Sequence, residues 1–216
     1  MDGNERTHFA EAMVTHTTSF FREAPQFDWL LAEELPRLAR ERPGRRISIW
    51  SAACSTGQEG YTALIAARMA EISLGVSLDT ALIGTDLSRT ALQQAARAIY
   101  TAQQTESIPA AIRSEVLLSS REGPDRIRIV PELRRRATWR RANLATAEGL
   151  DGIKADIAFL RNVLIYFDAE VRGSVLDKVC NNLEPGAVLF VGHTEAAQVR
   201  HPGLTAIRPS ILRWAP

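Results

Sequence analysis

The chain has 216 residues, of which 45% are hydrophobic and 24% are charged, and its formal net charge is +1. This length and apolar content suit one packed domain, and the balanced charge argues against binding to nucleic acids or membrane surfaces through overall charge. The two cysteines, Cys54 and Cys180, have neither metal-ligand spacing nor the density of a disulfide framework. The sequence begins without a signal-peptide pattern, and no apolar run is long enough to cross a bilayer. We therefore expect a cytoplasmic protein that does not insert into a membrane.

Helical spacing of apolar residues marks the first part of the chain. Residues 5–14 are mildly amphipathic and predict a short helix. A longer helix is predicted from about Pro25 towards Arg40, with Pro36 expected to kink or restart it. The dipeptide at 43–44, Pro-Gly, is expected to end it.

From residue 47 onward, short β-prone runs alternate with helical patterns. Strands are predicted at 47–51, 81–84, 139–144, 155–160 and 187–192, with one or two final edge strands at about 204–214. Helices are predicted after the turn at 54–57, from Ser88 to about Ile99, and at 169–183. Ser88 and Asp168 are the expected N-caps. The alternation favours an α/β fold with a mostly parallel, doubly wound sheet.

The pattern changes between about residues 109 and 141, where we expect an inserted β-subdomain. A hairpin is predicted around 126–130, and arginines crowd the region: Arg126, Arg128, Arg134, Arg135, Arg136, Arg140 and Arg141. These arginines form either a solvated charged face or a docking surface for a partner. Aromatic residues do not interleave with them, so nucleic-acid binding is a poor fit.

A turn rich in small residues follows the first predicted strand, at 51–59. In a doubly wound sheet, ligands bind beyond the carboxyl ends of the strands, and small residues let the backbone approach them. The turn lacks both Gly-x-Gly-x-x-Gly and a P-loop lysine, so a nucleoside without phosphates, such as S-adenosylmethionine (SAM), fits better than a pyrophosphate ligand. Glu59 suits a cationic sulfonium and amine, or it complements the helix dipole. The alternative is an ordinary strand-to-helix turn.

Polar residues also end two later strands. Asp86 closes the second strand, where a carboxylate accepts hydrogen bonds from ribose hydroxyls or caps the next helix. The stretch 161–168, Arg-Asn-Val-Leu-Ile-Tyr-Phe-Asp, follows the strand at 155–160, and its Arg161 and Asn162 need partners at a buried strand end. The four histidines form no metal-ligand constellation.

Five motifs occur in the order found in the CheR-type methyltransferases of bacterial chemotaxis. Residues 17–23 resemble that family's Thr-x-Phe-Phe-Arg-Glu segment, and residues 50–59 resemble its Ser-Ala-x-x-Ser-Thr-Gly-x-Glu turn. Thr85-Asp86 matches its ribose-binding acid, 161–168 its Arg-Asn-Val-x-Ile-Tyr-Phe-Asp signature, and 192–195 its Gly-His-Ser-Glu. The resemblance spans about residues 9–214. The helical domain that usually precedes this region in the family has no counterpart in the printed sequence.

The resemblance implies a Rossmann-like SAM-binding sheet with a small β-subdomain, and it implies roles for individual residues. A connecting helix and segment at 1–24 would precede the methyltransferase domain at 25–216. The residues that would contact SAM or line its pocket are His16, Thr18, Arg22, Glu59, Asp86, Asn143, Leu144, Arg161 and Asn162. Arg22 and Tyr166 would also face the transferring methyl group and the substrate carboxylate. His16 stands where the family often has asparagine, and Gly60 stands where it has proline, which predicts a looser helix start.

The implied reaction is methylation of glutamate carboxylates on a chemoreceptor or a related signalling protein, giving a methyl ester and S-adenosylhomocysteine. A carboxylate is ionised at neutral pH and is already a nucleophile, so the displacement needs alignment rather than a metal or a strong base. The Arg-rich subdomain is the expected docking region for that partner. The alternatives are a methyltransferase for a small molecule or another protein, and a non-catalytic SAM-binding signalling module.

Overall fold

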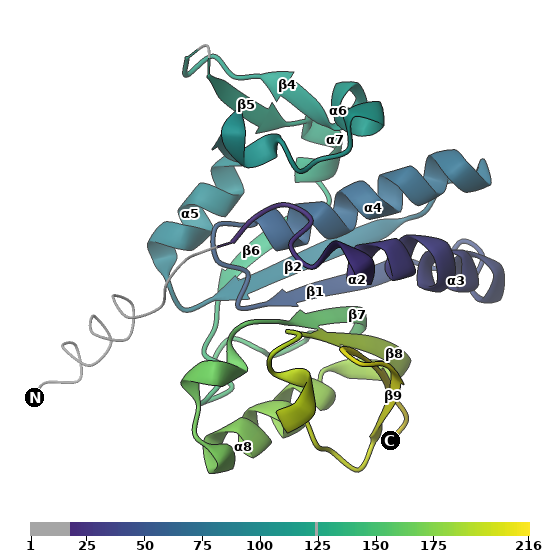
Figure 1. Cartoon of the computed structure of the whole chain (residues 1–216), viewed down its shortest axis with the longest axis vertical. Helices are drawn as coiled ribbons and strands as arrows, with labels where there is room; N and C mark the ends of the chain where they lie inside the picture. Colours follow the sequence, from purple (N-terminus) through teal and green to yellow (C-terminus); the bar gives the residue numbers. More distant parts are fainter. Residues whose placement is uncertain (1–17, 124) are drawn as a thin grey trace, which may run out of the picture.

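Two sheets organise the fold, a large one through the middle of the molecule and a small one at one end (Figure 1). The structure is a computed structural model that describes residues 18–123 and 125–216. The short helix predicted at 5–14 and the predicted cofactor contact His16 lie outside these residues. In the described part of the chain, no helix combines the length and the apolar character needed to cross a membrane.

The large sheet has seven strands, and the first five in spatial order are parallel to one another. That order is β6 (Ala137–Arg141), β2 (Thr80–Asp86), β1 (Ile47–Ala52), β7 (Ala155–Leu160), β8 (Leu183–Val191), β10 (Ile211–Trp214) and β9 (Leu204–Arg208). β10 runs antiparallel to both β8 and β9, so β9 forms the edge. The predicted mostly parallel sheet and the predicted final strands are therefore confirmed.

Helices cover both faces of the large sheet. Along β7, Ile157 and Phe159 belong to an apolar cluster shared with α2 (Ala24–Trp29), α3 (Leu35–Glu41) and α4 (Gln58–Leu74). The alternate residues Ala158 and Leu160 belong to a second cluster, shared with α8 (Ala169–Cys180). A strand buried on both faces needs apolar residues at successive positions, which explains the apolar run after Asp156. The doubly wound arrangement predicted from the sequence is confirmed.

The chain reverses its direction of travel across the sheet between β1 and β7. From β1 it moves outward through α4 to β2, through α5 (Arg89–Arg97) and the small sheet, and then to β6. It returns to place β7 on the other side of β1. Such a switch in strand order opens a crevice at the carboxyl ends of the two strands, where ligands of doubly wound sheets bind.

The predicted helix from Pro25 towards Arg40 is not continuous α-helix. A π-helical turn at Leu30–Glu34 separates α2 from α3, and Pro36 occupies the first turn of α3. Proline has no N–H to donate and its ring clashes with the preceding turn, so the helix widens into a π-helical turn before it and the α-helix resumes at Leu35, with Pro36 in its first turn. The predicted restart at Pro36 is confirmed, and the π-helical turn is an addition that the apolar spacing did not show.

Two predicted helices are shorter than expected. The helix beginning at Ser88 ends at Arg97, because Ala98 adopts a left-handed conformation with φ 53° and Ile99 enters a strand. The helix predicted at 169–183 ends at Cys180, and Leu183 already pairs with Ala155 in the large sheet. The register of β8 is irregular between Leu183 and Val188, which accommodates Pro185 and Gly186 within the strand. The N-caps are as predicted, since Ser88 accepts from Ala91 N and Asp168 from Val171 N.

The small sheet is antiparallel, with strand order β3 (Ile99–Thr101), β5 (Arg126–Ile129) and β4 (Leu117–Ser119). It carries the short helices α6 (Ala110–Val116) and α7 (Pro131–Arg134). Its strands therefore span 99–129 rather than lying within the expected 109–141, and β6, at the end of that range, pairs with β2 in the large sheet. The sequence did not reveal β3 because three residues are too few to show strand periodicity.

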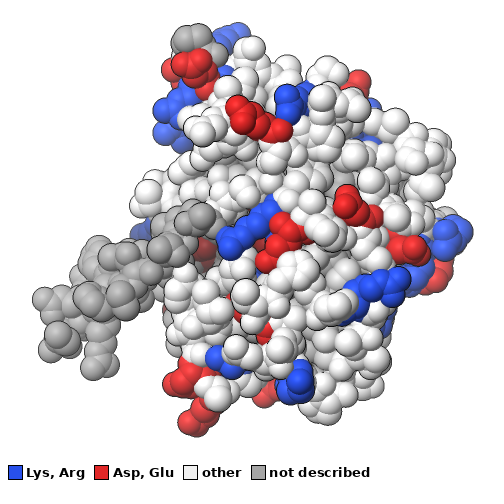
Figure 2. Space-filling model, in the orientation of Figure 1, with Lys and Arg blue, Asp and Glu red and all other residues white. Residues whose placement is uncertain are grey.

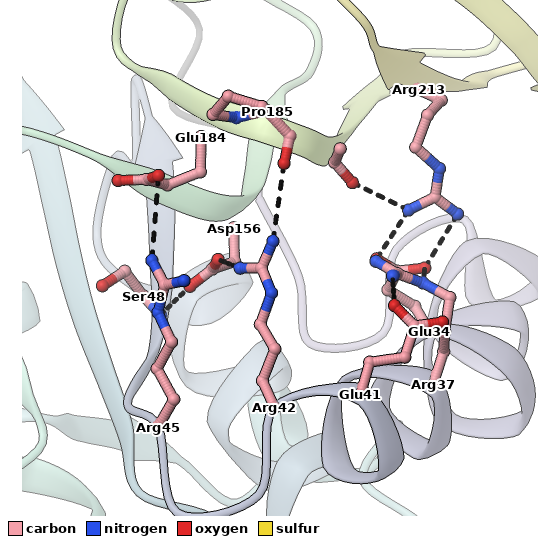
Figure 3. Close-up of polar contacts among 11 residues, drawn as sticks. Glu34, Arg37, Glu41, Arg42, Arg45, Ser48, Asp156, Glu184, Pro185 and Arg213 are labelled. Carbon is pink, nitrogen blue, oxygen red and sulfur yellow. Dashed lines mark hydrogen bonds and ion pairs between the residues drawn. The ribbon is translucent and has the colours of Figure 1, made fainter.

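Charged side chains between Glu34 and Arg45 contact β7, β8 and β10 of the large sheet (Figure 3). Glu34, whose side chain is 1% exposed, accepts from Arg37 Nη2 at 2.6 Å and from Arg213 Nη1 and Nη2 at 2.8 and 3.0 Å. We call these three residues the polar clamp. Beside it, Arg42 pairs with Asp156, the second residue of β7. A buried carboxylate needs such compensation, and the clamp ties α3 to β10 at the amino-terminal end of the parallel strands, away from the crevice.

Candidate functional site

A cleft of about 300 Å³ opens at the carboxyl ends of β1, β2, β7 and β8. It lies at the switch in strand order, and its volume is in the range of small-ligand sites. The structure brings together seven of the predicted site residues on its lining: Thr18, Arg22, Glu59, Asp86, Arg161, Asn162 and Tyr166. The segment before α2 therefore meets strand ends that are far away in sequence.

The turn after β1 approaches the end of β2 through its backbone. Ser55 N donates to Asp86 Oδ2 at 2.8 Å, and Ser88 N donates to Asp86 Oδ1 at 2.9 Å. Each carboxylate oxygen still has acceptor capacity, so Asp86 can also receive two hydroxyl groups of a ribose. Ser88 caps α5 itself, with its Oγ accepting from Ala91 N at 3.2 Å. The N-cap of α5 is therefore Ser88, two residues after Asp86. Asp86 does not cap this helix, so the ribose role is the interpretation of Asp86 that remains.

Gly57 and Gly60 let α4 begin close to neighbouring elements. Gly57 is the N-cap of α4 with φ 93°, and a Cβ there would lie 2.8 Å from Ala95 Cβ. A Cβ at Gly60 would lie 2.7 Å from Leu82 Cδ2 and 3.2 Å from the ring of Trp139. Gly60 stands where the family has proline. Because it has no side chain, Leu82 and Trp139 can pack directly against the first turn of α4.

Arg161 sits between two carboxylates at the floor of the cleft. Its side chain is 2% exposed, with Nη1 3.3 Å from Glu59 Oε2 and Nη2 3.4 Å from Glu23 Oε2. It also donates to Arg22 O and lies over the Phe27 ring, 5.4 Å from the ring centroid. These contacts fix the end of β7 against the segment that precedes α2, so Arg161 has the partners that a buried strand end demands.

Glu59 is a largely buried carboxylate, with its side chain 13% exposed, and opposing effects act on its pKa. Burial raises its pKa, while the Arg161 charge and the hydroxyl of Ser51, which donates to Glu59 Oε1 at 2.6 Å, oppose that shift. A cation bound in the cleft would favour the ionised form further.

The donor and acceptor set of the cleft fits SAM. SAM carries two cationic groups, a carboxylate and a ribose diol, and the lining offers the carboxylates of Glu23, Glu59 and Asp86 with the guanidinium groups of Arg22 and Arg161. Glu23 Oε2 and Arg161 Nε are buried without a hydrogen-bond partner among the described residues. Buried polar atoms of this kind normally find partners, and a polar ligand supplies them.

The wall formed after β7 carries the residues expected at the methyl group. Asn162 has a left-handed backbone with φ 55°, and a 3-10 turn at Leu164–Tyr166 follows it. Ile165 is 51% exposed and Tyr166 is 45% exposed, and both line the cleft. Tyr166 thus lies at the same cleft as Arg22, which lines it from the segment preceding α2.

Asn143 and Leu144 do not line this cleft. They follow the carboxyl end of β6, where Asn143 Oδ1 accepts from Ala145 N at 2.9 Å and Leu144 is 8% exposed. Conversely, Glu23, Ser55 and Thr194 line the cleft but were not singled out from the sequence. All three lie inside motifs recognised in the sequence, which is the signal that points to them.

The arginines expected to crowd the subdomain are divided between the two sheets. Arg126 and Arg128 lie on β5, whereas Arg140 and Arg141 lie on β6. Arg136 is partly buried and donates to Glu71 Oε1 at 3.1 Å and Thr80 Oγ1 at 3.0 Å. On the face shown in Figure 2, acidic and basic side chains are interspersed without a large area of one sign. Arg136 therefore supports the packing of the fold, and the remaining arginines do not form one basic surface on the face shown.

Comparisons with known proteins agree with the fold and the cleft. The chain matches the family described as CheR methyltransferase, SAM binding domain, over residues 16–209. It is 36% identical to chemotaxis protein methyltransferase Cher2 of Pseudomonas putida over 198 residues, covering 90% of this chain and 70% of that protein. Chemotaxis protein methyltransferase 1 of Pseudomonas aeruginosa is 35% identical, over 90% of this chain and 71% of that protein. The chain therefore belongs to the CheR methyltransferase family and is a SAM-dependent methyltransferase.

Proposed function

We propose that this protein methylates glutamate side chains of a chemoreceptor or a related signalling protein in the cytoplasm. The observation that carries the proposal is the meeting of Arg22 and Tyr166 at a cleft that also holds Glu59 and Asp86. An arginine and a tyrosine hydroxyl suit an incoming carboxylate, and the acidic residues suit a cationic nucleoside. Relatives named chemotaxis protein methyltransferase support the same acceptor class.

In this proposal the residues bind and align rather than transfer protons. Bound SAM supplies a methyl group on a cationic sulfur, which a carboxylate oxygen displaces to give a methyl ester and S-adenosylhomocysteine. Asp86 would hold the ribose, while Thr18, Glu59, Arg161 and Asn162 would hold the remainder of the cofactor. Good alignment of this kind supplies roughly 7–11 kcal/mol at best.

Arg22 would orient the acceptor carboxylate by a charge-assisted hydrogen bond, and Tyr166 would donate to its second oxygen. The acceptor loses its negative charge as the ester forms, so a tight grip on the carboxylate would favour the ground state and slow transfer. A tyrosine hydroxyl at a half-exposed position is a moderate donor that meets this requirement.

For the docking of the partner we propose the β4 edge of the small sheet. Among the described residues, β4 pairs with β5 alone, and its Leu118 is 49% exposed. An extended segment of the partner can add to such an edge by β-augmentation, with Arg126 and Arg128 on the neighbouring strand offering positive charge. Tyr100 of β3 donates to Thr56 O at 2.9 Å, which connects the small sheet to the turn between β1 and α4 at the cleft.

The test is transfer from SAM labelled in its methyl group to membranes that contain chemoreceptors, followed by alkaline release of methanol. Label that is released by alkali from the receptor is the expected result, and receptors whose methylation-site glutamates are replaced by glutamine provide the control. Turnover without receptor would instead indicate a small-molecule or other protein substrate. SAM binding without any transfer would indicate a non-catalytic module.

A further inference from the structure

A buried carboxylate stands behind the wall of the cleft that carries Tyr166. Glu195 follows β8 and is 1% exposed. Its Oε2 accepts from Asn162 N at 2.7 Å and from Gly192 N at 3.0 Å, and its Oε1 accepts from Ile165 N at 3.2 Å. One side chain thus holds three backbone amides from two loops that are about thirty residues apart.

The carboxylate of Glu195 is tightly packed against Gly192. A Cβ at Gly192 would lie 2.4 Å from Glu195 Oε2 and 3.0 Å from Asn162 Nδ2, so a side chain there would displace the carboxylate. Asn162 adopts φ 55°, a conformation that asparagine tolerates but that needs support from its neighbours. The amide of Asn162 makes the shortest of the three hydrogen bonds, which supplies that support.

Two of the three amides belong to the part of the chain that forms the proposed methyl-transfer wall, and the third belongs to the loop after β8. Asn162 and Ile165 line the cleft, and Ile165 precedes Tyr166 within the same 3-10 turn. On the other loop, Thr194 lines the cleft immediately before Glu195. A change in the position of the carboxylate therefore moves cleft-lining residues on both loops together.

We infer that Glu195 is a positioning residue for methyl transfer, which locks the loops after β7 and β8 and so sets the placement of Asn162 and Tyr166. Its effect on turnover rests on the proposed function, but its effect on the loops does not. Glu195 itself does not line the cleft, so it acts through the residues that do. Misplacement of reacting groups by about 1 Å can cost about 100-fold in rate.

The test compares Glu195→Gln with Glu34→Gln. Glutamine keeps the shape of the side chain but offers one acceptor oxygen, so it cannot serve all the amides and its NH₂ group opposes at least one of them. Glu34 is an equally buried carboxylate, 1% exposed, in the polar clamp at the other end of the strands (Figure 3). Both variants lose a buried charge, but only the first touches the cleft wall.

Three quantities are measured on folded protein: hydrogen exchange of the amides of Asn162 and Ile165, kcat, and the affinity for S-adenosylhomocysteine. For Glu195→Gln we expect faster exchange at these amides and a kcat lowered about 10- to 100-fold, with a smaller loss of affinity. For Glu34→Gln we expect lower thermal stability but unchanged exchange at these amides and unchanged kcat. Gly192→Ala, which displaces the carboxylate without removing it, should reproduce the exchange and kcat effects of Glu195→Gln.

Unchanged exchange and kcat in folded Glu195→Gln, or equal kcat losses in both glutamine variants, would overturn the assignment. The two proposals fail in different ways. If the protein methylates no receptor, the exchange rates and the affinity for S-adenosylhomocysteine still report on the loops. If Glu195 has only a general stabilising role, receptor methylation remains and the exchange difference between the two variants disappears.

Discussion

Gly57, the N-cap of α4, offers a quantitative test of how tightly the turn between β1 and α4 packs against its neighbours. Replacing Gly57 with alanine adds a Cβ that would lie 2.8 Å from Ala95 Cβ and 3.1 Å from both Ala95 Cα and the Trp139 ring. The left-handed backbone at φ 93° costs about 1–2 kcal/mol for a residue with a side chain. Overpacking against the backbone of Ala95 and the partly buried Trp139 ring adds about 1–3 kcal/mol. The expected loss of unfolding free energy is therefore about 2–5 kcal/mol.

Two other glycines separate these contributions. Gly152 has φ 73° with open space around its Cβ position, so alanine there should cost only the backbone part, about 1–2 kcal/mol. Gly173 lies inside α8, also with open space, so alanine there should stabilise the protein by up to about 1 kcal/mol. Chemical denaturation of the three variants and the parent measures all the differences on one scale.

The same substitution should weaken cofactor binding, because Gly57 precedes Glu59 by two residues and shares its turn with Ser55. Calorimetry with S-adenosylhomocysteine should show lower affinity for Gly57→Ala and no change for the variants of Gly152 and Gly173. A Gly57→Ala protein as stable as Gly152→Ala would refute the packing argument. Unchanged affinity in a destabilised Gly57→Ala protein would refute the link between this turn and the cofactor.

Three further predictions concern the cleft. Tyr166→Phe should lower kcat about 10- to 100-fold with little change in affinity for S-adenosylhomocysteine, and full turnover would remove the hydroxyl from the mechanism. Asp86→Ala should weaken binding of S-adenosylhomocysteine about 10- to 100-fold in calorimetry, and unchanged affinity would contradict the ribose role. Because the pKa of Glu59 is raised in the folded protein above its ordinary 4.5, its ionisation costs stability above the raised pKa. Relative to Glu59→Gln, the parent should gain unfolding free energy as the pH falls through that pKa towards 4.5, and a flat difference in denaturation experiments would disprove this.

The sequence was informative where local chemistry decides the structure. Ser88 and Asp168 cap their helices as predicted, because a side-chain oxygen beside an amide at a helix start needs no distant partner. The strands of the parallel sheet were predictable from their apolar runs. The meeting of Glu59, Asp86 and Arg161 was predictable because the carboxyl ends of parallel strands share one edge.

The sequence was less informative where distant residues decide the structure. Ile99 fits the apolar face of α5, yet it pairs with Arg128 in the small sheet, a partner that periodicity cannot reveal. Arg136 belongs by sequence to a basic run, but Glu71 and Thr80 draw it into the structure. Glu195 lies in a recognised motif, although its partners are backbone amides that carry no sequence signal.

The polar clamp links the two ends of the described chain, and this has a consequence for synthesis. Glu34 and Arg213 are separated by 179 residues. At about 5–20 residues per second, roughly 10–35 seconds pass between the production of the one and of the other. During that interval the carboxylate of Glu34 has Arg37 beside it but not the second arginine that accompanies its burial. The strand β10, the last of the large sheet to be made, therefore completes the contacts that hold α3 in place.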